Sequence, residues 1–140
     1  MKFFSVFTVL AASTALAFGS FIELGFPQNG ANFHANQEVT AQVILPESMA
    51  SCIDVGIALA INNCQNGVCP QPSSALGDVL YAGPFTPTNH GNGKFFQNIT
   101  VTLPDYVQKG EAIFSLTHLC LAGARPTPFL EYRNATVNIV

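Results

Sequence analysis

The sequence predicts an all-β protein: an antiparallel immunoglobulin-like β-sandwich of about seven strands, stapled by disulfides. Three observations lead to this prediction. Short apolar segments recur along the chain with turn residues between them. Several of these segments alternate apolar and polar residues, which is the period of a strand with one buried face. No segment shows an apolar stripe at helical period. A closed barrel is the main alternative architecture.

The chain begins with a secretory signal. Its first segment, MKFFSVFTVLAASTALA, has one Lys, then an apolar run, then the small residues of Ala15-Leu16-Ala17. This order predicts a signal peptide over residues 1–17, cleaved before Phe18. A membrane anchor is the alternative, but the apolar run is shorter than the roughly 18 residues that a span requires. We therefore expect residues 18–140 to form a single secreted, extracellular domain with no integral membrane segment.

The first three expected strands lie in the N-terminal half. Residues 21–26 form a short apolar segment that stops at the turn sequence Pro27-Gln28-Asn29-Gly30. Residues 38–45 alternate cleanly, with an inward set of Val39, Ala41, Val43 and Leu45. Residues 52–61 are more continuously apolar, so we expect a central strand that is covered on both faces.

Four further strands complete the expected sandwich, at residues 79–85, 95–103, 112–122 and 130–140. In the segment 95–103 the polar residues Asn98, Thr100 and Thr102 alternate with the apolar residues Phe95, Ile99, Val101 and Leu103. In the last segment Ala135, Val137 and Ile139 are expected to point inward.

Two N-glycosylation acceptors lie on expected outward faces. They are Asn98-Ile99-Thr100 and Asn134-Ala135-Thr136. A glycan at Asn98 would shield the polar face of its strand, so we expect that face to be scaffold. Binding is then expected on the loops or on the opposite sheet.

Charge and cysteine content restrict the partners and the compartment. Loss of Lys2 leaves four basic residues against eight acidic ones, a net charge of −4. Nucleic acid and anionic membranes are therefore poor partners.

The four cysteines predict two disulfides in an oxidising compartment. Three pairings are open; we favour Cys64 with Cys69, because the intervening QNGV contains the turn dipeptide Asn-Gly, and Cys52 with Cys120. A zinc site on Cys64-x4-Cys69 and His118-x-Cys120 is the alternative.

Catalytic residues are sparse. His34, His90 and His118 are the only histidines, and neither a GxSxG nor an HExxH motif is present. Ser115 and His118 lie three apart, so on one strand they face opposite sides. The carboxylates are scattered and the chain has no Trp, which argues against glycoside hydrolysis. We expect no enzyme and no catalytic, cofactor or metal site, and we expect His118 to be structural.

Four segments of the chain resemble small secreted fungal proteins of the necrosis-inducing secreted (Nis-like) family: FIELGFPQNGANF, CQNGVCPQPSSALGDVLYAGPF, FFQNITVTLP and KGEAIFSLTHLCLAGARPTPFLEYRNATVNIV. The resemblance covers nearly all of the mature chain. It implies a small, cysteine-containing, sandwich-like apoplastic protein. Some members of this family act as effectors on plant immune receptor kinases and can trigger cell death.

The family resemblance and the residues lead to three hypotheses. The first is a non-enzymatic, effector-like glycoprotein that engages an extracellular protein through loops 62–75, 86–94 and 123–129. In the last loop, GARPTPF replaces the glycine- and phenylalanine-rich turn of the family, and Arg125 with Phe129 is the best candidate contact. The second is a carrier of a lipid or other apolar ligand between the sheets. The third is a protein associated with cell-wall glycans.

Overall fold

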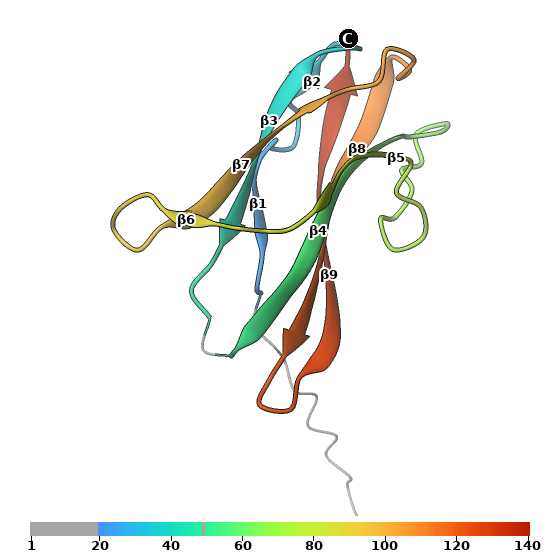
Figure 1. The fold of residues 1–140 in the computed structure, drawn as a ribbon. Helices are drawn as coiled ribbons and strands as arrows, with labels where there is room; N and C mark the ends of the chain where they lie inside the picture. Colours follow the sequence, from blue (N-terminus) through green and yellow to red (C-terminus); the bar gives the residue numbers. More distant parts are fainter. Residues whose placement is uncertain (1–19, 49) are drawn as a thin grey trace, which may run out of the picture.

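The computed structural model describes residues 20–48 and 50–140, and the predicted signal peptide lies outside these residues. The described chain contains nine strands in two sheets, and no helix is found within it (Figure 1). The all-β prediction is therefore confirmed.

The two sheets lie face to face with long strands at their centres (Figure 1). The four-stranded sheet has the order β1-β3-β7-β6, formed by Glu23–Phe26, Glu38–Leu45, Phe95–Thr102 and Thr88–Asn89. The five-stranded sheet has the order β2-β9-β8-β4-β5, formed by Asn32–Phe33, Thr127–Ile139, Gly110–Ala122, Cys52–Asn63 and Asp78–Gly83. All pairs are antiparallel except β2 with β9.

Seven of the nine strands correspond to the seven expected ones. The two additional strands, β2 and β6, are two residues long. Such short strands carry no alternation that a sequence pattern can reveal. Their pairing depends on where β9 and β7 place their free edges, which is a property of the assembled sandwich.

The core lies between the sheets and consists of the inward side chains of both. The predicted alternation is confirmed in β3, β7 and β9, where eight inward positions are at most 7% exposed: Val39, Ala41, Val43, Ile99, Val101, Ala135, Val137 and Ile139. Leu45 was also expected inward, but it lies at the end of β3 and is only partly buried. Facing residues of β4 and β8, such as Leu59 and Leu116, join them in one cluster. These side chains occupy the space that the carrier hypothesis assigns to a ligand. Phe95 was expected inward, but it lies at the start of β7 beside the β6–β7 turn and is 38% exposed.

Two disulfides join the pairs that the sequence favours. Cys52–Cys120 links the neighbouring strands β4 and β8, and Cys64–Cys69 closes the loop that follows β4. The second bridge spans a turn in which Asn66 and Gly67 both have positive φ, at 52° and 74°. Asn and Gly tolerate this conformation better than other residues.

The prediction for β4 is wrong in one respect. The apolar run 52–61 was expected to be covered on both faces, yet Ile53 is 57% and Val55 is 54% exposed. The strand is central within its sheet, between β8 and β5, but no described layer covers the outer face of that sheet at this end. The apolar composition of β4 therefore does not mean that both of its faces are buried.

Candidate interaction surface

The outer face of the four-stranded sheet is polar. Thr40 and Thr100 lie opposite each other on β3 and β7, and their hydroxyl oxygens are 2.9 Å apart. Asn98 is exposed on the same face, so a glycan there would stand over this sheet. That this face is scaffold stays a prediction.

The outer face of the five-stranded sheet is apolar at the end that contains the β8–β9 turn. Strand register places its side chains in rows across β4, β8 and β9. We call this surface the apolar face; it consists of Ile53, Val55, Leu119, Leu121, Pro128 and Leu130. Leu130 is 47% exposed, comparable with Ile53 and Val55. Contiguous apolar surface of this kind marks sites of interaction in monomeric proteins.

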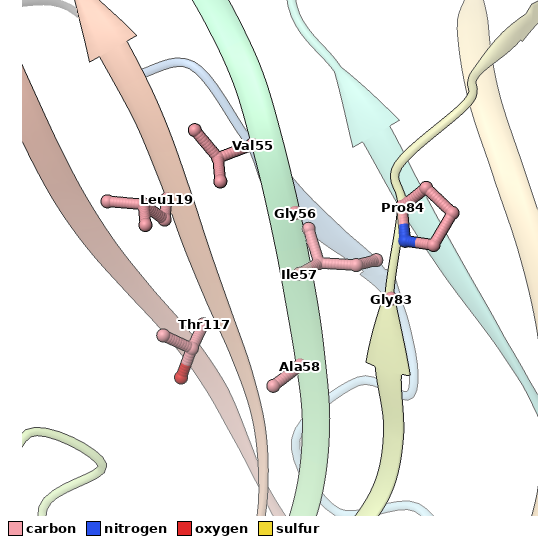
Figure 2. A pocket seen from close by; sticks show the side chains of 8 residues that line it. All are labelled: Val55, Gly56, Ile57, Ala58, Gly83, Pro84, Thr117 and Leu119. Carbon is pink, nitrogen blue, oxygen red and sulfur yellow. The ribbon is translucent and has the colours of Figure 1, made fainter.

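A hollow of about 460 Å³ adjoins the apolar face between β8, β4 and the end of β5 (Figure 2). Figure 2 shows Val55 and Leu119 at one side of it and Pro84 at the other. The backbones of β4 and β5 approach closely beside it: a Cβ on Gly56 would lie 3.0 Å from the carbonyl oxygen of Gly83. Thr117, which also lines the hollow, has a buried hydroxyl with no hydrogen-bond partner among the described residues. The hollow is thus shallow, open and mostly apolar.

A β-bulge gives the hollow its shape. The register of β4 against β8 shifts between Asp54 and Gly56, which leaves Val55 as an inserted residue. Such an insertion bends a strand and re-aims its side chains. Here Val55 turns to the outside, while the preceding Asp54 reaches a partner on the inner side of the sheet.

That partner is His118, which is fully buried on β8. Its Nε2 atom lies 2.7 Å from Oδ1 of Asp54, and its Nδ1 atom lies 3.3 Å from Oε2 of Glu131 on β9. Arg133 donates to Oε1 of Glu131 at 2.9 Å, and the backbone N–H of Phe21 lies within 3.2 Å of both carboxylate oxygens. Asp54, His118, Glu131 and Arg133 form one network beneath the apolar face.

The family is identified by the comparison with family models. The model of the Nis1 family matches residues 17–138, nearly the whole chain. The chain belongs to the Nis1 family. The resemblance found in the sequence is thereby confirmed. The comparison with curated proteins gives no match.

The Nis1 family is a family of secreted effectors, and the two disulfides are compatible with an extracellular location. In the described part of the chain, no helix combines the length and apolarity needed to cross a bilayer. The alternative zinc site of this Nis1 family member would use Cys64, Cys69 and Cys120, and all three of these cysteines form disulfides.

The predicted contact residues lie at the end of the apolar face. Arg125 is exposed in the turn between β8 and β9, and Pro128 follows it on the apolar face. Phe129 points to the other side of β9 and packs edge-to-face on Phe21, with ring centroids 5.6 Å apart. The two residues are therefore not brought together on one surface.

The three predicted loops do not gather either. Figure 1 shows the loop after β4 at one side of the sandwich, the β6–β7 turn at the opposite side and the β8–β9 turn at a third place. A partner that contacts the β8–β9 turn would meet the apolar face before it reached the other loops. A second histidine, His90 in the β6–β7 turn, stacks on Phe96 with ring centroids 3.5 Å apart.

Sequence reasoning missed the apolar face and the network beneath it. One signal for the face was present: the run IDVGIALAI and the segment LTHLCLA are apolar at both alternating sets of positions. For the network, the only signal was that a single acid or histidine interrupts each of these apolar segments. Neither signal says which residues of the three strands lie side by side.

Proposed function

We propose that this protein is a non-enzymatic, effector-like secreted protein that binds an extracellular protein through the apolar face and the adjacent β8–β9 turn. Membership of the Nis1 family supports the effector role. The single observation that carries the choice of surface is the exposure of Ile53 and Val55 on β4 and of Leu130 on β9, across β8, on an uncovered sheet. The surface carries no charged side chain of its own, so the fitting partner presents apolar, uncharged side chains.

Glycans at the two predicted acceptor sites would favour the same surface. Asn98 is on the opposite face, where a glycan would oppose a close protein contact. Asn134 lies on the outer face of the five-stranded sheet, but four residues along β9 from Leu130, about 14 Å at about 3.4 Å per residue. Glycans at both sites would leave the end with the β8–β9 turn as the accessible approach. Arg125 at this turn would then contribute a contact at the rim.

We also infer that the sandwich is of the immunoglobulin type. The order β1-β3-β7-β6 corresponds to strands A, B, E and D of that fold, and β9-β8-β4 corresponds to G, F and C. Two features differ from antibody domains: the Cys52–Cys120 disulfide joins neighbouring strands of one sheet, and the chain has no Trp.

A matched pair of valines tests the binding surface. Val55→Asp places a charge on the apolar face, and Val68→Asp places the same charge in the cysteine loop, where Val68 is 70% exposed. Both proteins are secreted from a eukaryotic host and tested against a panel of extracellular domains of plant immune receptor kinases, the partner class that the family resemblance implies.

We expect at least about tenfold weaker binding for Val55→Asp than for the unaltered protein, because a buried unpaired charge opposes the contact. Val68→Asp is expected to bind as the unaltered protein does. Equal binding by all three proteins, with circular dichroism and disulfide mass unchanged, would exclude the apolar face. Replacing Arg125 by Glu tests the rim in the same assay, and an unchanged affinity would remove the β8–β9 turn from the proposal.

A further inference from the structure

We infer that the proton on the buried His118 ring sets the shape of the β4 bulge, so that the hollow beside the apolar face changes with pH. As regulation of partner binding, this inference rests on the proposed function. The coupling between ring and bulge is a property of the chain alone and can be measured without a partner.

The first step is the chemistry of the ring. Both nitrogens of His118 face carboxylate oxygens, at 2.7 Å and 3.3 Å. A carboxylate only accepts hydrogen bonds, and a neutral imidazole has one donor nitrogen and one acceptor nitrogen. Only the imidazolium ion donates to Asp54 and Glu131 together. With both carboxyls ionised, the contacts in the structure are those of the protonated ring.

The second step is the charge of the surroundings. From β4 the ring faces Asp54, and from β9 it faces Glu131, which also pairs with Arg133. The segment after β5 contributes the uncharged ring of Phe85, whose centroid is 6.1 Å from that of His118. With the ring protonated, the formal charges of the four ionic groups cancel. Loss of the proton leaves one uncompensated negative charge and turns a nitrogen lone pair toward a carboxylate.

The third step is which contact breaks. The Glu131 carboxyl is 5% exposed and is held by Arg133 and by the N–H of Phe21, so it has no access to a replacement solvent shell. The Asp54 side chain is 27% exposed and can turn to water. Because a buried carboxylate facing a lone pair is the costlier arrangement, the remaining proton stays on Nδ1 and Asp54 is released.

The fourth step connects Asp54 to the surface. Asp54 directly precedes Val55, the inserted residue of the bulge, and Val55 with Gly56 lines the hollow. The contact between Asp54 and His118 fixes the inward side of the bulge. Release of Asp54 therefore frees the backbone at the next residue, Val55, which forms the rim of the hollow. The hollow in the structure is thus the form that belongs to the protonated ring.

The experiment is an NMR titration of the secreted, disulfide-closed protein, with labelled valine methyl groups and labelled histidine rings. We expect the Val55 methyl signals to shift with the same midpoint as the His118 ring signals, while the methyl signals of Val68 in the cysteine loop stay unchanged. In Asp54→Asn the amide can accept from the charged ring and donate to the neutral ring. This variant is expected to lose at least about three quarters of the Val55 shift, an estimate that assigns most of the response to release of the carboxylate.

Two results would overturn the inference. One is a His118 ring that titrates while the Val55 methyl signals stay constant. The other is a ring that does not titrate at any pH at which the protein remains folded. A coupled titration together with failure of every receptor domain to bind would leave this inference standing and count against the proposed function. Binding that requires Val55 without a coupled titration would do the reverse.

Discussion

Replacing Glu131 with Gln tests the network where its contacts converge. Glu131 is 6% exposed, and its two oxygens receive Arg133, His118 and the N–H of Phe21. An amide of the same shape keeps one acceptor oxygen and turns an NH2 donor toward other donors. One charge-assisted hydrogen bond is lost and another is weakened. At about 1.5–3 kcal/mol each, we expect the free energy of unfolding to fall by about 3 kcal/mol.

The measurements are urea unfolding and thermal unfolding at fixed pH with the disulfides intact, both followed by circular dichroism. A loss of about 3 kcal/mol should lower Tm by about 12 °C for a domain of this size, with an unchanged dependence on urea concentration. Glu111→Gln is the control, because Glu111 is exposed on the neighbouring strand β8. It is expected to change stability by less than about 0.5 kcal/mol. Equal effects of the two substitutions would refute the claim that the buried network stabilises the fold.

Three further outcomes are expected. Thr117→Val should raise the free energy of unfolding by about 1 kcal/mol in the same assay, because it removes a buried hydroxyl that has no partner among the described residues; a loss of stability would contradict this. Serine at both Cys64 and Cys69 should lower the free energy of unfolding by about 2 kcal/mol, the entropic contribution of closing a short loop. A loss above about 4 kcal/mol would show that the bridge stabilises the fold by more than this entropy. The hydrogen bond from Tyr106 to Asp78, 2.8 Å long, and the charge of that carboxylate raise the pKa of Tyr106 above its usual value. This bond favours the protonated phenol, so its contribution is present below the ordinary Tyr pKa and is lost as pH rises through the raised one; Asp78→Asn should return the Tyr106 pKa, read from its NMR signals, toward the usual value, and no change would exclude this cause.

The sequence by itself determined the seven longer strands and most of the inner faces of β3 and β9. In β3 and β9 the alternation of Val39, Ala41 and Val43, and of Val137 and Ile139, is a local property with period two, and burial follows it. The pairing of Cys64 with Cys69 is also local, since an Asn-Gly turn brings the two residues together.

Only the tertiary structure decided the candidate surface. The continuous apolar run of β4 is compatible with burial on two faces or with one exposed apolar face, and the choice depends on whether another layer covers the sheet. The network is equally non-local: Asp54 and His118 are 64 residues apart, and Phe21 and Glu131 are 110 apart. Strand order and register bring these groups within hydrogen-bonding distance. At the β4 bulge, Asp54 faces inward and the inserted residue Val55 faces outward. Alternation specifies the side of a strand on which a residue lies, whereas contact across strands requires the assembled sheet.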